Sequence, residues 1–440
     1  MTARQTLRLL QRYESRNVTF IEADGSWPIV WERARGVHVW DAAGRKYLDL
    51  TSAFGVAAAG HANPRVVRAG QRQMAKLLHA MGDVHPHALK AELARELSRI
   101  TFERWGSSKL KAQGLADAKT IFCNSGFEAV EAALKTALLA TGRRGIIAFE
   151  GAYHGLGYGA LNATHRAMFR APFREQLGKF GRFVPFPTAP EQLANTEAAL
   201  RRAFRQTPIG AILVEPVQGR GGVRIPPPAF LPLLRRLCDE HGALLLLDEI
   251  FTGFGRTGKW FACEHSGVVP DVSCLGKALT GGFPLSACVG RADVMDAAWP
   301  ATQGEAIHTS TFLGHPVGCA MALAQIAELK SRSLIERSAR LGERLLTGLS
   351  QVQSPKSKVV ARARGLGLLA GLELLHADGS PATGESLRVI KALLHRGFIL
   401  LPEGEHSNVI GFTPPLTITD AQLETAVAAF VDIFTNIPKP

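Results

Sequence analysis

The stretch "LLLLDEIFTGFGRTGKW", residues 244–260, joins an apolar run to two acidic residues and a glycine-rich loop. Four leucines lead directly into Asp248 and Glu249. An apolar run of this length that ends at a turn predicts a strand buried on both faces. A carboxylate at the end of such a strand is costly unless a cation meets it. The sequence therefore predicts a cation beside Asp248.

Similar short apolar runs recur along the middle of the chain. Between them, residues 130–138 carry apolar side chains at i, i+3 and i+4, which predicts a helix with one buried face. This alternation predicts an α/β fold with a mostly parallel sheet covered by helices, and with ligands at the carboxyl ends of the strands. The other expected strands are residues 119–124, 144–150, 209–215 and 285–290.

The two ends of the chain have a different pattern. Residues 26–50 predict a small antiparallel meander that turns at "DAAGR", and residues 357–440 mix short strands with helices. We therefore expect a large domain at residues 70–325 and a smaller α+β domain built from residues 1–69 and 326–440.

Composition excludes several classes of protein. The 440 residues carry a formal charge of +13, but the basic residues are dispersed and are not interleaved with aromatics, so nucleic-acid binding is not expected. No apolar run is long enough to cross a bilayer, and residues 1–25 lack the apolar segment of a secretory signal. The six cysteines form no C-x-x-C pair, so neither a metal site nor a disulfide framework is indicated. We expect a cytoplasmic protein without a membrane partner.

A candidate anion site lies in "CNSGFEAVEAALK", residues 123–135. Ser125, Gly126 and Phe127 stand where a strand ends and a helix begins, so free backbone N–H groups and the helix dipole could hold a phosphate. The competing interpretation is an ordinary helix cap, with Glu128 in the first turn for the same electrostatic reason.

A candidate catalytic lysine lies in "PDVSCLGKALTGGFPLSACV", residues 270–289. Lys277 is surrounded in sequence by apolar residues, and burial would lower its pKa and free the amine to form a Schiff base. The alternative is a lysine that reaches the surface from an apolar loop. A lysine, a phosphate turn and a strand-end acid on one sheet are what a pyridoxal phosphate site requires, with the pyridinium as the cation for Asp248.

Residues 244–287 as a whole resemble the signature of the class III pyridoxal-phosphate-dependent aminotransferases, which have the type I fold. The resemblance extends over nearly the whole chain, through "EPVQGRGGV" (215–223) and "HTSTFLGHPVGCA" (308–320) to "GFTPPLTIT" (411–419). It implies pyridoxal 5'-phosphate as cofactor, with Lys277 as the Schiff-base lysine, and a homodimer with shared active sites.

The resemblance also implies contacts to the cofactor and the substrate. Tyr153 would stack on the cofactor ring and Ile250 would pack on its other face, although both residue types are common in cores. Gln218 would reach the ring hydroxyl. Thr311 would bind the phosphate of the partner subunit's cofactor, or it is simply a helix cap. Phe54 would line the substrate pocket.

Three positions depart from the family's pattern. Gly411 stands where many members have an arginine for a substrate carboxylate, and Arg220 stands where those members commonly have a glutamate. One interpretation is drift in a pocket that binds no carboxylate. The other is that the positive charge has moved across the pocket, so that Arg220 grips a substrate carboxylate. Phe127, where the family usually has a small residue, has no explanation from the sequence.

Three functions are compatible with these residues. The first is amino-group transfer from an amine or amino acid to a keto acid by a ping-pong mechanism, with Lys277 also moving the proton. The second is an amino-acid epimerase or racemase that uses the same site. The third is a cofactor-binding protein without turnover, which the presence of Lys277 and Asp248 disfavours.

Overall fold

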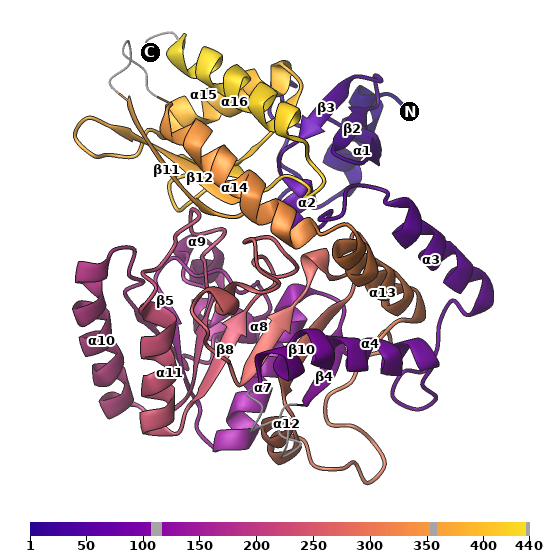
Figure 1. Ribbon diagram of the computed structural model, residues 1–440, viewed down its shortest axis with the longest axis vertical. Helices are drawn as coiled ribbons and strands as arrows, with labels where there is room; N and C mark the ends of the chain where they lie inside the picture. Colours follow the sequence, from indigo (N-terminus) through magenta and orange to yellow (C-terminus); the bar gives the residue numbers. More distant parts are fainter. Residues whose placement is uncertain (107–116, 353–358, 437–440) are drawn as a thin grey trace.

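The structure is a computed structural model that describes residues 1–106, 117–352 and 359–436. Within these ranges a seven-stranded sheet forms the centre of the molecule (Figure 1). The chain runs parallel in most of it, while β10 pairs antiparallel with both of its neighbours. In spatial order the strands are β4 (Ala118–Cys123), β10 (Ser286–Arg291), β9 (Val272–Leu275), β8 (Leu244–Asp248), β7 (Ile209–Val214), β5 (Gly145–Phe149) and β6 (Gly181–Val184).

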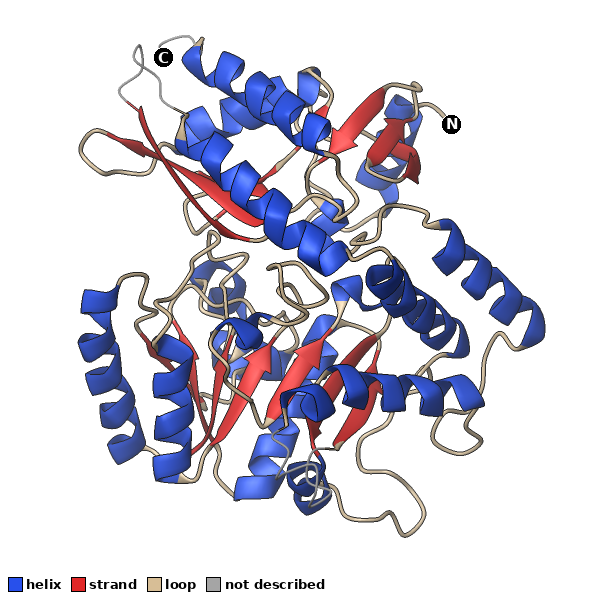
Figure 2. Ribbon diagram, viewed as in Figure 1, coloured by secondary structure: helices blue, strands red, loops and turns tan. Residues whose placement is uncertain are grey.

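The leucine run forms β8 because both faces of this strand are covered. Leu246 packs in the cluster that contains the buried face of α7, and Leu245 and Leu247 pack in the cluster that contains α11. The alternation follows from the two-residue period of a strand. Helices therefore cover both faces of the sheet (Figure 2), as expected for a parallel sheet.

The helices of the described residues are mostly two to five turns long. They are α1 (Ala3–Tyr13), α2 (Ser52–Gly55), α3 (Pro64–Lys76), α4 (Ala88–Ile100), α5 (Phe102–Trp105), α7 (Gly126–Thr141), α8 (Tyr158–Leu161), α9 (Ala167–Arg170), α10 (Leu193–Gln206), α11 (Phe230–His241), α12 (Ala292–Ala298), α13 (Pro316–Ser331), α14 (Leu334–Ser350), α15 (Thr383–His395) and α16 (Asp420–Thr435).

Two smaller sheets lie at the other end of the molecule (Figure 1). The expected meander is present as β1 (Trp31–Arg35), β2 (His38–Asp41) and β3 (Lys46–Asp49), and Asp41 accepts hydrogen bonds across its turn from the N–H groups of Ala43 and Arg45, both at 2.9 Å. The remaining strands are β13 (Phe398–Ile399), which joins β3, and β11 (Val359–Leu366), β12 (Leu369–His376), β15 (Val409–Phe412) and β14 (Leu401–Glu403).

The expected domain boundaries fall inside helices. Position 69 lies in α3 and position 325 lies in α13, and these two helices pack against each other. They connect the part of the chain that forms the large sheet with the part that forms the small sheets (Figure 1). The division at these residues therefore stays a proposal.

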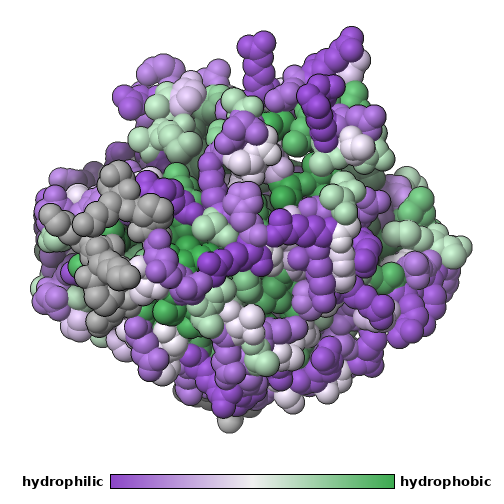
Figure 3. Space-filling model, turned by 90° about the horizontal axis from the view of Figure 1, so that it is seen from above, coloured by the Kyte–Doolittle hydropathy of each residue, from purple (hydrophilic) through white to green (hydrophobic). Residues whose placement is uncertain are grey.

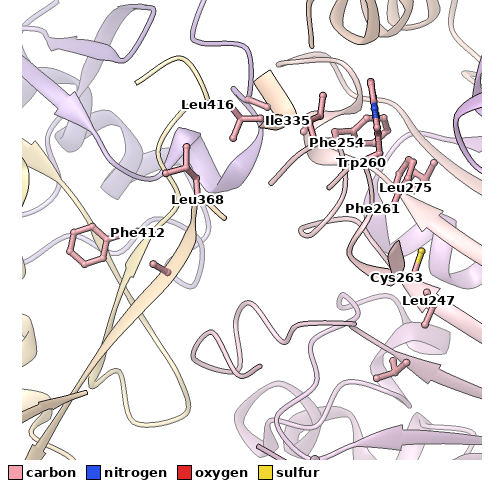
Figure 4. Packing of buried hydrophobic residues seen from close by; sticks show 14 of the residues in the cluster. Leu247, Phe254, Trp260, Phe261, Cys263, Leu275, Ile335, Leu368, Phe412 and Leu416 are labelled. Atoms are coloured by element: carbon pink, nitrogen blue, oxygen red, sulfur yellow. The ribbon is translucent and has the colours of Figure 1, made fainter. Parts of the chain in front are cut away.

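The glycine-rich loop after β8 binds the two parts of the molecule together. Arg256 is fully buried and donates to the carbonyl oxygens of Leu368 at 3.0 Å and Pro414 at 2.6 Å. Gly255 has a φ of +90°, and an added Cβ would lie 3.1 Å from atoms of both Ile335 and Leu416. Phe254 and Phe261 of this loop lie in the same buried cluster as Leu416 (Figure 4).

The surface carries both hydrophilic and hydrophobic residues. On the face seen from above, hydrophilic residues predominate and hydrophobic ones show between them (Figure 3). Among the described residues, no helix has both the length and the apolar character that a membrane crossing demands.

Candidate functional site

A cavity of about 710 Å³ lies where β8 and β9 end. Its wall combines aromatic side chains with a few charged groups, which is the usual character of a small-molecule site. The predicted site residues that line it are Phe54, Gly126, Phe127, Tyr153, Arg220, Asp248, Ile250 and Lys277.

Lys277 reaches this cavity because β9 lies beside β8. Asp248 pairs in register with Cys274, and Lys277 follows three residues later, at the start of a short 3₁₀ turn. The Nζ atom lies 4.7 Å from the centre of the Phe251 ring. Burial lowers the pKa of Lys277 from its ordinary value, while Asp248 opposes this shift. The environment thus favours the neutral, nucleophilic amine.

The backbone of Lys277 is strained. Its φ is +40°, in the left-handed region that non-glycine residues rarely occupy. Strain of this kind persists where the surrounding structure fixes it, and it clusters at active sites. The adjacent strand and turn therefore hold this lysine in one place at the cavity wall.

His154 contacts Asp248 and also lines the cavity. Its Nδ1 lies 2.8 Å from Oδ2 of Asp248, and the N–H of Ile250 donates to Oδ1 at 3.1 Å. His154 is buried, and its Nε2 has no partner among the described residues. Sequence reasoning missed this histidine, although it directly follows Tyr153 in "AYHG". Asp248 thus has a neighbour that fixes its orientation while it still lines the cavity.

The start of α7 offers donors to an anion. Glu128 accepts from the N–H groups of Asn124 at 2.7 Å and Ser125 at 2.9 Å, so the helix-cap interpretation is correct for these two groups. The Oγ of Ser125 is buried and has no partner among the described residues. Gly126 and Phe127 line the cavity. A phosphate is the kind of group that this unpartnered hydroxyl and the first helical N–H groups can hold.

Phe127 fits beside the helix start because its neighbours lack side chains. A Cβ on Gly155 would lie 2.3 Å from the Cβ of Phe127, and a Cβ on Gly157 would lie 2.6 Å from its ring. Two glycines, Gly155 and Gly157, therefore leave the space that the Phe127 side chain fills. Phe127 remains 39% exposed.

Aromatic and aliphatic side chains form the apolar part of the wall. Tyr153 packs edge-on against Phe169, with ring centres 5.8 Å apart, and burial raises the pKa of the Tyr153 hydroxyl. Ile250 contacts Gly126, where an added Cβ would lie 3.0 Å from Cδ1 of Ile250. Phe54 is 58% exposed and also lines the cavity.

Gln218 is not among the residues that line the cavity. Its amide nitrogen donates to the carbonyl oxygen of Glu150 at 2.9 Å, and its oxygen accepts from Arg224 at 3.2 Å. Its expected contact with a cofactor ring stays a prediction. Three residues earlier, Glu215 lines the cavity instead.

Glu215 is a buried acid that sequence reasoning did not select. Its carboxyl accepts from the N–H groups of Tyr153 at 2.9 Å and Gly219 at 3.1 Å. Burial raises the pKa of Glu215 to about 7, against the opposing effect of His154. This carboxyl therefore titrates near neutral pH.

Arg220 lines the cavity and forms an ion pair within the protein. Its Nη1 donates to Oε2 of Glu403 at 3.1 Å, and Glu403 also lines the cavity. Glu403 belongs to β14, next to Gly411 in β15. In the family pattern an arginine at position 411 pairs with an acid at position 220. Here the arginine is at position 220, and its acid is Glu403 in β14.

Thr311 lies outside this cavity. It is exposed, between α12 and α13, on a segment that begins beyond Trp299. Its expected role concerns the cofactor of a second subunit, which a single chain does not display. That role stays a prediction.

The described residues contain no group of three or more histidine, cysteine or acidic side chains arranged to hold a metal ion. The six cysteines are free and buried.

Comparisons with known proteins agree with this geometry. Residues 20–434 match the model of the family "Aminotransferase class-III". The 5-aminovalerate aminotransferase of Pseudomonas aeruginosa is 38% identical over 421 residues, which cover 93% of this chain and 94% of that protein. An acetylornithine aminotransferase of Methanosarcina mazei is 36% identical over 403 residues, covering 92% and 91%.

A solved structure is similar in fold. The ornithine aminotransferase from Toxoplasma gondii, crystallised with partial occupancy of pyridoxal phosphate at its active site, superposes with a TM-score of 0.84 at 28% identity, covering 99% of this chain and 95% of that chain.

Proposed function

Since this chain belongs to the class III aminotransferases, which depend on pyridoxal 5'-phosphate, we propose that its amino donors are ω-amino acids whose carboxylate binds Arg220. The enzyme moves an amino group from an amine or amino acid to a keto acid in two half-reactions. The observation that carries the proposal is that Lys277, Asp248 and Arg220 line one cavity. No observation favours an epimerase.

The residues of the cavity fit the cofactor. Ser125 has an unpartnered hydroxyl at the start of α7, where Gly126 and Phe127 would supply N–H groups to the phosphate. Tyr153 and Ile250 would enclose the ring. When bound, pyridoxal phosphate supplies a carbonyl carbon that takes up the amino group and a ring that withdraws electrons from the substrate.

Lys277 and Asp248 carry the chemistry of the chain itself. Lys277 would hold the cofactor covalently through Nζ and would then move a proton to and from the substrate carbon with the same atom. Burial lowers the pKa of Lys277, which favours the neutral amine. Asp248 would keep the ring nitrogen protonated, with His154 holding its carboxylate in place.

The relatives support a substrate with two functional groups. Both have names that specify an amino acid as substrate, 5-aminovalerate in one and acetylornithine in the other. Arg220 is the charged group on the cavity wall with the geometry to bind a carboxylate through two parallel hydrogen bonds. The aromatic wall formed by Phe54, Phe127 and Tyr153 suits the methylene chain between the two groups.

The experiment compares 5-aminovalerate with pentylamine, which has the same chain without the carboxylate, each with a panel of keto acids. In Arg220→Ala, kcat/KM for 5-aminovalerate should fall. The fall should correspond to a loss of about 2–4 kcal/mol in transition-state binding, the range for a charge-assisted contact that loses one partner. Pentylamine should be spared. Equal losses for the two donors would mean that Arg220 has a structural role.

The homodimer belongs to the same proposal, because the expected role of Thr311 requires a second subunit. Its exposure is compatible with burial against a partner copy. We also expect a cytoplasmic location, which cell fractionation tests.

A further inference from the structure

Glu403 holds only one edge of the Arg220 guanidinium. The contact is between Nη1 and Oε2, at 3.1 Å. The Nε and Nη2 atoms of Arg220 have no partner among the described residues. The Arg220 side chain is 33% exposed and that of Glu403 is 9% exposed, so the arginine is the more accessible member of the pair. Nε and Nη2 form the fork that binds a carboxylate by two parallel hydrogen bonds.

The backbone around Arg220 is fixed by other groups. The carbonyl oxygen of Arg220 accepts from the N–H of Gly404 and from Nη2 of Arg166, both at 3.1 Å. Arg364 donates to the carbonyl oxygens of Gly222 and Val223 at 2.7–3.0 Å. Removing the carboxylate of Glu403 therefore leaves the loop in place and frees only the side chain of Arg220.

Gly411 provides the space in which Glu403 lies. An added Cβ at this glycine would be 3.0 Å from Cγ of Glu403, which is tighter than ordinary contact. The φ of Gly411 is not in the left-handed region, so the requirement is for space and not for an unusual backbone. A larger residue at position 411 would displace Glu403 from Arg220.

Positive groups surround Glu403, but its pKa is raised overall from the ordinary value. Burial raises the pKa of Glu403, while Arg220, Arg166 and Lys277 each oppose this. Two arginines that face one buried glutamate leave one positive charge for a ligand, since Glu405 beside them is exposed and screened by water. One substrate carboxylate would complete the balance.

We infer that Glu403 is a positioning residue for substrate recognition: it holds Nη1 of Arg220 so that the Nε–Nη2 edge faces the substrate carboxylate, and Gly411 is needed to accommodate it. The inference rests on the proposed function, because it requires that Arg220 binds a carboxylate. The inference adds that Glu403 and Gly411 affect specificity through Arg220 and need not touch the substrate themselves.

The test measures kcat and KM of the holoenzyme for 5-aminovalerate and pentylamine in Arg220→Ala, Glu403→Gln, Glu403→Ala and Gly411→Ala. We expect Glu403→Ala and Gly411→Ala to raise KM for 5-aminovalerate about tenfold with little change in kcat, the loss of one well-oriented contact. Glu403→Gln keeps one acceptor and should show a smaller rise. The KM for pentylamine should stay within about twofold, as should all values in the matched control Glu405→Gln.

The outcomes separate the inference from the proposed function. If Arg220→Ala affects only 5-aminovalerate while Glu403→Ala and Gly411→Ala change nothing, the carboxylate role of Arg220 stands and the positioning role is wrong. A fall in KM for 5-aminovalerate in Glu403→Gln would show that Glu403 competes with the substrate, which overturns the inference. If Arg220→Ala lowers kcat/KM equally for both donors, the proposal that Arg220 binds the substrate carboxylate is wrong, and the inference about Glu403 is wrong with it.

Discussion

Lys277 combines a strained backbone with an amine whose pKa is lowered by burial. Both features follow from its place just after β9, beside Asp248 and under Phe251. A surface lysine would keep its proton and would be free to move. The same residue can thus serve as the attachment point for the cofactor and as the proton carrier.

The Lys277→Ala variant should fold, bind pyridoxal phosphate without a covalent link and lose at least about 10³-fold in turnover, because nucleophile and proton carrier are one group. Denaturing mass spectrometry after borohydride treatment measures the covalent link. The wild-type enzyme should gain the mass of the cofactor on the peptide that contains residue 277, and the variant should not. Cofactor still fixed to that peptide would contradict the assignment.

Glu215 gives the stability a pH dependence with a definite sign. Its pKa rises from the ordinary 4.5 to about 7 on folding. Between these values the folded protein binds more protons than the unfolded chain, so stability falls as pH rises from about 4.5 to about 7. The shift corresponds to at most about 3 kcal/mol.

The Glu215→Gln variant should lack this contribution. The free energy of unfolding of each cofactor-free protein is measured by urea denaturation at each pH. We expect it to fall more for the wild-type protein than for the variant between pH 5 and pH 8. The comparison uses the difference between the two proteins, so other titrating groups cancel. Parallel pH curves would mean that Glu215 is ionised throughout this range.

At the scale of elements, the site depends on the loop that follows β8. Arg256 donates to two carbonyl oxygens and to Ser52 at 3.3 Å, which joins the loop after β8 to the segments around Leu368, Pro414 and Ser52. Burial lowers the pKa of Arg256 to about 9, so the guanidinium still carries its charge at pH 7. This contact helps to fix the relative position of Lys277 and Glu403, which both line the cavity.

Arg256→Ala should destabilise the protein by about 3–5 kcal/mol, because buried carbonyl groups lose their only charged donor. Urea denaturation of the holoenzyme measures this, and Arg256→Lys should recover part of the loss. The matched control is Lys259→Ala, which removes an exposed cation from the same loop and should cost less than about 0.5 kcal/mol. Similar losses in the two alanine variants would refute the bridging role of Arg256.

The elements also show which parts of the site a sequence can predict. Asp248 and Lys277 were predictable because each is a charge in an apolar segment, and both the fold and the family are confirmed. Glu403 was not, because it lies 183 positions from Arg220 and no local pattern marks it. Glu215 was not selected either, because its burial and its hydrogen bonds to Tyr153 and Gly219 come from the fold and not from a local sequence pattern. Strand β10 has the same apolar pattern as its neighbours, so its antiparallel direction could not be read from the sequence.

At the scale of the whole molecule, one chain does not bring every expected cofactor contact together. Gly126 and Phe127 line the cavity, whereas Thr311 is exposed and absent from its lining. Large apolar side chains are also exposed near that segment, namely Ile307 and Phe312. Exposed apolar residues beside an incomplete site are what a subunit interface with shared active sites would explain.

Mixed dimers test this arrangement directly. Thr311→Ala should weaken pyridoxal phosphate binding about tenfold through the loss of one hydroxyl contact to the phosphate, and Lys277→Ala abolishes turnover. If Thr311 serves the partner's site, a dimer of one Thr311→Ala subunit and one Lys277→Ala subunit contains one site with both native residues. Unfolding and refolding the two variants together in equal amounts should therefore restore tight-binding activity in about a quarter of all sites, as random pairing of subunits requires. Activity is measured at a cofactor concentration that saturates the wild-type enzyme but not Thr311→Ala, with each variant refolded alone as the control. If Thr311 acted within its own chain, no mixed site would contain both residues, and activity at limiting cofactor would not exceed that of the separately refolded Thr311→Ala protein in the same amount.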